Sequence, residues 1–310
     1  MKKYKIIVNP TSGRGTGKKS IPAIQQQLTS LNLDFDIILT ERPWHASDLA
    51  EQAVKDGYNV VVAAGGDGTV NEVMNGLMRA QENHLLAAAM GVLGVGRGND
   101  FAYGIHVPHN LEKDCRILAE DHRIAIDVGY VEGGDYPDGR FFANGIGIGF
   151  DTVVGFEAAK LKYLTGFPSY AVAAIKTIFL YNNPPLVQIE TDEDVFTIPA
   201  LMVSVMNGQR MGGGFLMAPE GDPHDGLLDI CIARQVSRGK ILALIPHFIK
   251  GDQKAHPAVQ MLRCKKIKIT ALEGSLPAHA DGETLCEAGK ELAVELLPQR
   301  LEIICDKSLD

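Results

Sequence analysis

The chain has 310 residues, of which 22% are charged and 45% hydrophobic, and its formal net charge is −8 at pH 7. These values are ordinary for a globular protein, and the length suggests about two domains. A net negative charge argues against the broad basic surface that nucleic-acid binding needs, so we expect no nucleic-acid partner. It also provides no overall attraction to an anionic membrane, which leaves only a local basic patch to supply one.

Five cysteines are scattered along the chain, and none forms a Cys-x-x-Cys pair. This pattern favours buried, reduced thiols over a structural zinc site. The first residues, MKKYKIIVNP, contain no apolar signal region, and no apolar run reaches the roughly 18 residues of a membrane-spanning helix. We therefore expect a cytoplasmic protein that can touch the inner face of a membrane without crossing it.

The first third of the chain alternates between strand-like and helix-like patterns. The expected strands are Tyr4–Val8, Phe35–Leu39, Asn59–Ala64 and Ala88–Leu93, and the expected helices are Ile21–Leu31, Ala46–Asp56 and Asn71–Ala80. The run Asn59–Ala64 is β-branched and almost wholly apolar, which is typical of a central parallel strand. Such alternation predicts a Rossmann-like open α/β sheet with helices on both faces.

After about residue 127 the pattern changes to short alternating segments separated by turns, which predicts an antiparallel β-sandwich. The expected strands are Ala125–Val131, Arg140–Ile148, Leu186–Glu190, Val195–Val205, Leu228–Ala233, Lys265–Ala271 and Ala293–Leu297. Two helical insertions are expected at Glu157–Tyr181 and Arg238–Lys250. We therefore divide the chain into domains 1–127 and 128–298. Residues 299–310, with a strand at Leu301–Cys305, are expected to return to the first domain.

The strongest motif is Gly65-Gly66-Asp67-Gly68-Thr69, which lies directly after one expected strand and before a helix. A glycine turn in this place lets backbone N–H groups close on a phosphate, aided by the helix N-terminus. Asp67 would repel a bare phosphate, so its partner would be a phosphate-bound Mg²⁺ or a hydroxyl that loses its proton. The alternative is a tight turn in which Asp-Gly serves geometry alone.

Two further turns follow expected strands, Asn9–Gly13 and Gly94–Ala102. Each is weak evidence alone, but parallel strands end at the same edge of a sheet, so three turns are predicted to converge on one crevice. The run Ser12–Lys19 fails the spacing of a phosphate loop, and neither Gly66 nor Gly94 begins a complete dinucleotide fingerprint. The sequence thus predicts a phosphate site that is neither of these two standard types.

The second domain contains the pair Asp281-Gly282-Glu283. An Asp and a Glu so close together can supply a general base and a contact to a metal or hydroxyl. Taken alone, the same three residues are more typical of a solvated hairpin turn.

The order and spacing of Asn9–Gly13, Gly65–Glu72, Gly98–Ala102 and Asp281–Glu283 resemble the diacylglycerol kinase catalytic-domain family, which is related to sphingosine kinases. The resemblance covers essentially the whole chain. GGDGT alone is shared with NAD kinases and phosphofructokinases, whereas GGDGTVNE with a downstream DGE is specific. The resemblance implies an N-terminal α/β domain that binds ATP and a C-terminal β-sandwich domain, with lipid entering between them.

The resemblance also implies roles for single residues. Asp67 would work with Mg²⁺ and the ATP phosphates, and Asp100 would lie close to the same chemistry. Asp281 and Glu283 would face the acceptor hydroxyl, with Glu283 as the proton acceptor. The nucleotide site would be lined by Asn9, Pro10, Thr11, Ser12, Gly13, Thr40, Gly65, Gly66, Asp67, Gly68, Thr69, Val70, Asn71 and Glu72.

Two positions depart from the family pattern. The family has a structural Mg²⁺ near an Asp-Asp-Gly-Leu turn, for which Asp222, Asp225 and the Leu227 carbonyl match by spacing, but His224 replaces an expected Asp. Arg97 stands where the family usually has Thr. It could hold a nucleotide phosphate, and it could equally reach solvent or pair with an acid.

The expected function is therefore an ATP- and Mg²⁺-dependent lipid kinase, with conversion of diacylglycerol to phosphatidic acid as the leading reaction. A soluble-substrate kinase related to NAD kinase and an inactive nucleotide- or lipid-binding regulator remain as alternatives. A homodimer is left open.

The segment Glu157–Tyr181 is the candidate for peripheral membrane contact. Lys160 and Lys162 stand close to Tyr163, and the run Ala171–Leu180 is apolar apart from Lys176 and Thr177. Basic and aromatic residues together suit the headgroup region of a bilayer. The alternative is a pair of helices that simply covers the sandwich.

Overall fold

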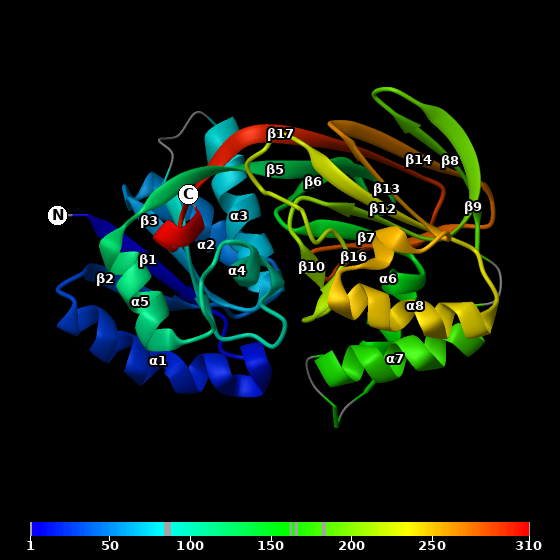
Figure 1. Cartoon of the computed structure of the whole chain (residues 1–310). Coiled ribbons are helices and arrows are strands. Elements are labelled where there is room, and N and C mark those ends of the chain that lie inside the picture. Colours follow the sequence, from blue (N-terminus) through cyan, green and yellow to red (C-terminus); the bar gives the residue numbers. More distant parts are fainter. Residues whose placement is uncertain (1, 84–87, 162, 165–166, 182–183, 310) are drawn as a thin grey trace. The chain divides into compact units, whose positions relative to one another are not determined.

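The computed structural model describes residues 2–83, 88–161, 163–164, 167–181 and 184–309 (Figure 1). The chain forms two compact units, Met1–Asp127 together with Pro298–Asp310, and Val128–Leu297. Strands β5 (Arg123–Gly133) and β17 (Glu291–Ile304) each run from one unit into the other.

The first unit is built on a parallel sheet in the order β2-β1-β3-β4, and the last residues of β17 lie parallel to β4. This arrangement confirms the expected α/β class. Its elements are β1 (Lys3–Val8), α1 (Ser12–Ser30), β2 (Asp34–Leu39), α2 (His45–Lys55), β3 (Val60–Gly65), α3 (Asp67–Glu82), β4 (Ala89–Gly94), α4 (Asp100–Gly104), α5 (Leu111–Glu120) and the short 3₁₀ turn η2 (Lys307–Leu309).

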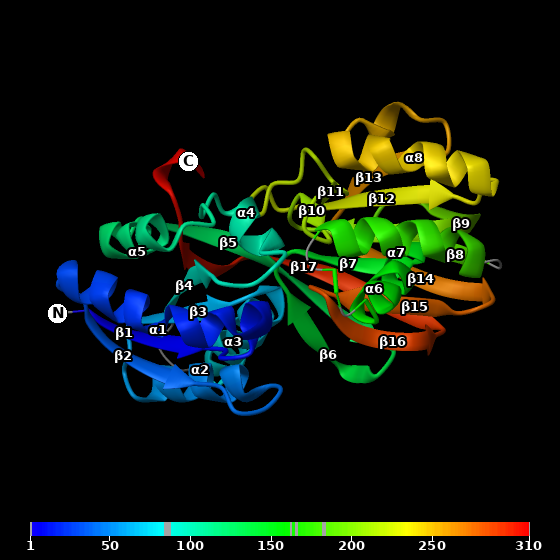
Figure 2. The same cartoon turned by 90° about the horizontal axis from the view of Figure 1, so that it is seen from below.

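Helices cover both faces of this sheet because successive strand residues point to opposite faces. Ile6 and Val62 pack with Ile24 of α1 and Leu118 of α5 in one buried cluster. Helices α2 and α3 lie together on the other face (Figures 1 and 2). They approach closely at Gly76, where an added Cβ would lie 2.2 Å from the Ser47 carbonyl oxygen.

Helix α1 begins nine residues before the expected Ile21. Its first residues are irregular, since Gly13, Arg14 and Gly15 have φ angles of 58°, 59° and 93°, and regular helix follows from Thr16. The apolar periodicity of a helix starts only near Ile21, where the helix packs on the sheet. The glycine-rich residues before it therefore give no helical pattern in the sequence.

The second unit is an antiparallel sandwich, as expected. One sheet has the order β16-β15-β7-β9-β12-β13, and the other contains β9-β8-β14-β17 with β5 and β6 beyond β17. Its strands are β6 (Tyr136–Phe142), β7 (Gly145–Gly149), β8 (Leu186–Thr191), β9 (Val195–Met206), β12 (Leu228–Arg234), β13 (Val259–Cys264), β14 (Lys266–Glu273), β15 (Leu276–Ala280) and β16 (Glu283–Gly289), with a small hairpin of β10 (Arg210–Met211) and β11 (Phe215–Leu216).

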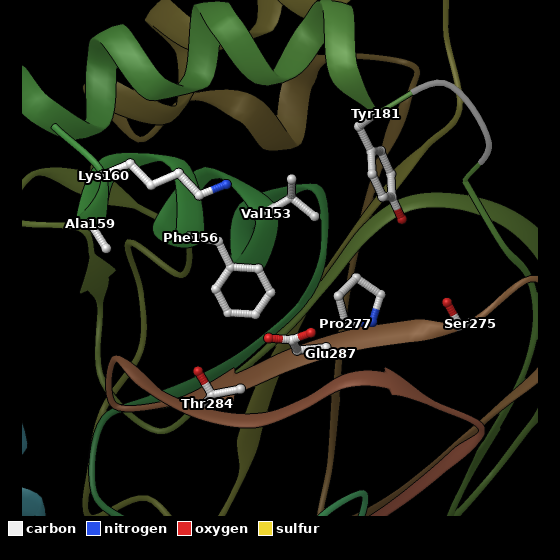
Figure 3. A pocket seen from close by; sticks show the side chains of 9 residues that line it. All are labelled: Val153, Phe156, Ala159, Lys160, Tyr181, Ser275, Pro277, Thr284 and Glu287. Carbon is white, nitrogen blue, oxygen red and sulfur yellow. The ribbon is translucent and has the colours of Figure 1, made fainter.

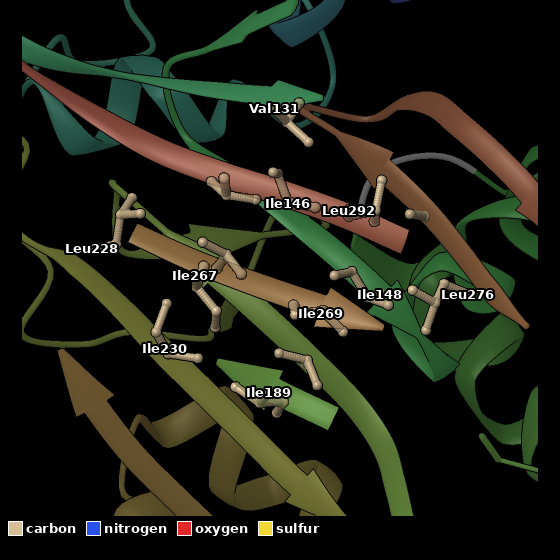
Figure 4. Close-up of a cluster of buried hydrophobic side chains, with 14 of the residues drawn as sticks. Val131, Ile146, Ile148, Ile189, Leu228, Ile230, Ile267, Ile269, Leu276 and Leu292 are labelled. Atoms are coloured by element: carbon tan, nitrogen blue, oxygen red, sulfur yellow. The ribbon is translucent and has the colours of Figure 1, made fainter. Parts of the chain in front are cut away.

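The core of the second unit lies between these two sheets. Ile146 of β7 and Ile230 of β12 meet Ile189 of β8 and Ile267 of β14 in one buried cluster (Figure 4). Alternate residues of the first sheet point outward instead, towards three helices. These are α6 (Phe150–Ala159), α7 (Phe167–Leu180) and α8 (Arg238–Lys250), followed by the 3₁₀ turn η1 (Gln253–Ala255).

Two expectations for this unit differ from the structure. The strand expected over Arg140–Ile148 is broken at Ala143-Asn144, because β6 pairs within one sheet of the sandwich and β7 within the other. The insertion expected over Glu157–Tyr181 consists of two helices, and the first already begins at Phe150. The five cysteines are all buried, in agreement with the sequence.

Candidate functional site

Three turns meet at the carboxyl edge of the parallel sheet. The Asn9 side chain Nδ2, after β1, donates to Thr69 Oγ1 in the first turn of α3 at 3.1 Å. The N–H of Val95, after β4, donates to the carbonyl of Gly65 at 3.0 Å. Thr40 follows β2 at the same edge, where its N–H donates to the Val8 carbonyl at 2.9 Å. Residues from four strand ends therefore share one edge.

Glycines allow these turns to lie in backbone contact. A Cβ atom on Gly96 would lie 2.3 Å from the Gly66 Cα, and one on Gly13 would lie 2.6 Å from the Val95 carbonyl oxygen. Real Cβ atoms cannot come so close, so the packing of the three turns requires residues without a side chain.

Asn9 organises the turn that follows β1. Its Oδ1 accepts from the Thr11 N–H at 3.0 Å and from Thr11 Oγ1 at 2.8 Å. Ser12 lies beside the glycine turn, since a Cβ on Gly66 would be 3.6 Å from Ser12 Oγ. One amide side chain thus ties the Asn9–Gly13 turn to itself and, through Thr69, to helix α3.

Asp67 is the first residue of α3 and reaches across to the turn after β4. Its Oδ1 accepts from the Phe101 N–H at 3.1 Å. Its Oδ2 would lie 2.9 Å from a Cβ on Gly98, and Asp100 Oδ2 would lie 3.5 Å from the same point. Asp67 and the buried Asp100 therefore flank Gly98, so the structure brings these two predicted site residues together.

The turn after β4 has a support that the sequence did not reveal. Asn99 adopts a left-handed conformation with φ 51°, and its Oδ1 accepts from the Gly96 N–H at 3.2 Å. Its Nδ2 contacts Nε2 of His109. His109 thus holds Asn99 next to Asp100.

Other predicted residues lie elsewhere in α3 and the turns. Glu72 Oε2 accepts from the Ala46 N–H at 3.0 Å, so this carboxylate serves the first turn of α2. Val70 and Asn71 are buried within the unit. Arg97 is exposed, and within the described parts of the chain its guanidinium has no ion-pair partner.

In the second unit, Asp281 and Gly282 form the two-residue turn between β15 and β16. Their φ angles of 48° and 85° are those of a type I′ hairpin turn. Asp281 is nevertheless buried, at 8% exposed, and accepts three backbone N–H groups: Ala143 at 2.8 Å, Asn144 at 3.0 Å and Gly145 at 2.9 Å. Its carboxylate therefore holds the link between β6 and β7, whereas Glu283 is exposed.

Next to this hairpin, His279, Asp151 and the buried Ser204 form a polar cluster, of which the sequence indicated only His279 as close to the site. A Cβ on Gly147 would lie 2.5 Å from His279 Nε2 and 2.6 Å from Asp151 Oδ2, so both groups approach β7 at one glycine. Ser204 Oγ donates to Asp151 Oδ2 at 3.1 Å. Burial lowers the pKa of His279 to about 4 and raises the pKa of Asp151 to about 6.

In the loop predicted to bind a metal, both aspartates are paired with basic side chains. Asp225 Oδ2 lies 3.3 Å from an Arg263 guanidinium nitrogen, and its Oδ1 accepts from the Leu227 N–H at 3.0 Å. Asp222 pairs with the His224 ring. Among the residues that the structure describes, no three His, Cys, Asp or Glu side chains form a metal-binding group. Asp222 and Asp225 therefore each have a side-chain partner with which a Mg²⁺ ion in this loop would share them.

A pocket of about 700 Å³ lies in the second unit. Figure 3 shows Val153 and Phe156 of α6 on one side and Pro277 and Glu287 of the β15–β16 hairpin on the other. Lys160, which the sequence suggested for membrane contact, lines this pocket and pairs with Glu157 at 2.5 Å. The complete lining is Val153, Phe156, Ala159, Lys160, Tyr181, Ser275, Pro277, Thr284 and Glu287.

Both units match known family models. Residues 3–131 match the diacylglycerol kinase catalytic domain, and residues 144–305 match the YegS C-terminal NAD kinase beta sandwich-like domain. A Staphylococcus carnosus protein named diacylglycerol kinase is 27% identical over 283 residues, covering 91% of this chain and 89% of that protein. A Staphylococcus aureus (strain Newman) protein of the same name is 29% identical, covering 91% and 86%.

Solved structures share the fold. A diacylglycerol kinase from Bacillus anthracis superposes with a TM-score of 0.76 at 22% identity, covering 100% of this chain and 98% of that one. An NAD kinase from Archaeoglobus fulgidus in complex with ATP gives a TM-score of 0.53 at 14% identity, covering 100% and 95%.

Proposed function

The chain belongs to the diacylglycerol kinase catalytic-domain family of lipid kinases, and on this premise we propose that it transfers the terminal phosphoryl group of ATP to a lipid hydroxyl, that of diacylglycerol first. The product would be phosphatidic acid. The relatives named diacylglycerol kinase support this choice of substrate class.

One observation carries the proposal, namely the convergence of three glycine turns around Asp67. In open α/β sheets, ligands bind outside the carboxyl ends of the strands. Here that edge offers backbone N–H groups, the N-terminus of α3 and a carboxylate beside Gly98. N–H groups and a helix N-terminus bind phosphate, and a fold neighbour was solved with ATP. The edge of the first unit is therefore the proposed ATP site, with Asn9, Pro10, Thr11, Ser12, Gly13 and Thr40 along it.

Mg²⁺ fits this edge as an ion shared with the nucleotide. It usually binds through one or two carboxylates plus phosphate oxygens, and Asp67 and Asp100 lie on either side of Gly98. When bound, the ion would neutralise charge on the phosphates. Asp67 keeps one oxygen on the Phe101 N–H, so its carboxylate is held in a defined orientation. Arg97, exposed in the same turn, is a candidate for a phosphate contact.

Glu283 is proposed as the proton acceptor for the lipid hydroxyl. Phosphoryl transfer forms a bond from the hydroxyl oxygen to the terminal phosphorus as the bond to the leaving phosphate oxygen breaks, and the hydroxyl proton needs a base. Glu283 is exposed at the start of β16. Asp281 is committed to three N–H groups, so it would position the turn that carries Glu283.

An ATP-consumption assay tests this function. Purified protein is given ATP with Mg²⁺ or with EDTA, and either diacylglycerol in mixed micelles, other hydroxylated lipids, or NAD. We expect Mg²⁺-dependent consumption with diacylglycerol and phosphatidic acid as the product. Consumption with NAD alone would support a soluble-substrate kinase instead, and no turnover with any acceptor would favour a binding regulator.

A further inference from the structure

Helix α7 buries its small side chains and exposes its large ones. Its buried positions include Ser169, Ala173, Ala174 and Thr177, with Ile178 as the one large member. Its exposed positions include Val172 at 44%, Ile175 at 50% and Phe179 at 58% exposure. The spacing i, i+3, i+7 places these three on one stripe of the helix. Packing against the sandwich does not explain this stripe, because the stripe faces away from it.

Helix α8, which contacts α7, also exposes apolar side chains. Leu242 and Ile249 are exposed at 43% and 41%, seven residues apart, with the exposed Pro246 between them. Figure 2 shows α7 and α8 close together in the second unit, and the two helices contact each other. The Arg238 guanidinium of α8 lies 5.8 Å from the ring centre of Phe179 of α7. We call the surface formed by Val172, Ile175, Phe179, Leu180, Leu242 and Ile249 the α7–α8 face.

Within the two helices every charged side chain is basic, although the exposed Asp252, just after α8, pairs with His247. The two helices, FPSYAVAAIKTIFL and RGKILALIPHFIK, contain no acidic residue, in a chain of net charge −8. Arg238 and Lys240 lie at one end of α8 and Lys250 at the other. Lys176 of α7 is paired with the buried Glu157 at 2.5 Å, so the cations of α8 supply most of the charge.

We propose that the α7–α8 face docks on the surface of an anionic lipid bilayer. An apolar stripe bordered by cations is the pattern of helices that lie in the interface between headgroups and acyl chains. No helix in the described parts of the chain is long and apolar enough to span a membrane, so the helices would lie on the surface. A second copy of the chain is a poorer occupant, because a two-fold contact through this face would bring its cations against one another.

Helix α7 lies within the segment Glu157–Tyr181 that the sequence predicted for membrane contact, but the cations of the α7–α8 face are not the predicted ones. Lys160 lines the pocket of the second unit, and Lys162 lies outside the described residues. The docking inference rests on the proposed function for its substrate, a bilayer lipid, but binding to vesicles can be measured without turnover.

Sedimentation with vesicles tests the docking. Wild type is mixed with vesicles of neutral phosphatidylcholine, alone or with anionic phosphatidylglycerol. The apolar test variant is Ile175→Asp/Phe179→Asp, and its control is Val195→Asp/Leu272→Asp, which changes exposed apolar residues elsewhere in the same unit. The charge variant is Lys240→Glu/Lys250→Glu, and its control is Lys3→Glu/Lys113→Glu, which changes the net charge equally at exposed lysines.

We expect wild type and both controls to bind the anionic vesicles. The charge variant should bind at least roughly 30-fold more weakly, since each cation near the surface contributes about fivefold, and added salt should weaken wild-type binding. The apolar variant should lose binding, yet keep turnover of a water-dispersed short-chain substrate. Equal binding by test and control variants, or a loss of turnover without a loss of binding, would overturn the assignment of this face.

A fluorescent variant gives a readout that does not depend on loss of binding. In Phe179→Trp, the new indole should be quenched by brominated acyl chains in anionic vesicles, whereas Trp44 of wild type should not. Light scattering on the same samples without vesicles measures the mass. A dimer that the Ile175→Asp/Phe179→Asp variant abolishes would assign the face to a second copy and overturn the bilayer proposal.

Discussion

His279 accepts a hydrogen bond at Nδ1 from the N–H of Gly282, at 3.3 Å. The ring is half-buried, and its removal from water lowers the pKa to about 4, so it stays neutral at physiological pH with its proton on Nε2. Gly282 is the second residue of the turn that leads to Glu283. A neutral, half-buried histidine therefore holds the turn that leads to the proposed base.

This relationship predicts that asparagine can replace His279 and leucine cannot. The amide oxygen of Asn lies near the position of Nδ1, so His279→Asn should keep the hydrogen bond and near-normal kcat, whereas His279→Leu should lower kcat by up to roughly 100-fold through misplacement of the turn. The KM for ATP should not change in either variant. An Asn variant as impaired as the Leu variant would mean that His279 acts in another way.

Asp67→Asn should nearly abolish phosphoryl transfer without loss of fold. Asn keeps an oxygen for the Phe101 N–H but loses the negative charge that the proposed metal and phosphates require. Asp67→Ala should be equally inactive and should also lose that hydrogen bond. Steady-state kinetics and melting temperature, with the exposed Asp48→Asn as the control, check this. Wild-type kcat in Asp67→Asn would place the chemistry elsewhere.

Glu283 and Asp281 should fail in different ways. Glu283→Gln should lower kcat by about 10²–10⁴-fold, the usual effect of removing a general base, with little change in ATP affinity or melting temperature. In Asp281→Asn, one of the two oxygens that accept the three N–H groups is replaced by an NH₂ group. The free energy of unfolding should therefore fall by about 1–3 kcal/mol, and the melting temperature with it. Kinetics with thermal melts separate the two effects. Similar stability losses in both variants would make Glu283 structural.

The sequence predicts a structural Mg²⁺ ion in the loop Asp222–Leu227, and thermal melts with EDTA test whether the ion binds there. Because Asp225 is paired with Arg263 and Asp222 with His224, we expect EDTA to leave the melting temperature of wild type unchanged. Asp225→Ala should lower it slightly by leaving the arginine without this partner, and Arg263→Gln should do the same. A drop with EDTA in wild type that is absent in Asp225→Ala would establish the Mg²⁺ site instead.

The contribution of Asp114 to stability should fall as the pH rises from about 4 to about 7. Asp114, in α5, is 1% exposed, and burial raises its pKa from 3.8 to about 7. The folded state then binds a proton that the unfolded state has lost, so this stabilisation is complete below about pH 4 and is gone above about pH 7. The raised pKa corresponds to at most about 4 kcal/mol. Thermal melts between pH 5 and 8 should show a steeper fall for wild type than for Asp114→Asn. Parallel curves would exclude Asp114 as the source.

Local patterns in the sequence were enough for the fold class and for the turns at the sheet edge. The β-branched run before Gly65 predicts a buried parallel strand, and three glycine-containing turns after three such strands must end at one edge. Asn9, Gly66 and Gly96 meet there as expected. These features follow from neighbouring residues along the chain, because side-chain alternation and glycine turns depend on short segments.

The tertiary structure alone decided what each polar group does. Asp281 accepts a hydrogen bond from the N–H of Ala143, 138 residues earlier in the chain. The sequence Asp281–Glu283 is typical of a solvated turn, but this contact buries the Asp281 carboxylate. This hydrogen bond lies in the link between β6 and β7, where the sequence predicts one continuous strand. Helix α7 has apolar residues on every side, so its periodicity does not show which of them face the sandwich and which face outward. The hydrogen bond of Asp281 and the buried side of α7 both depend on contacts between residues far apart in the chain. Such contacts are fixed only when the folded unit packs.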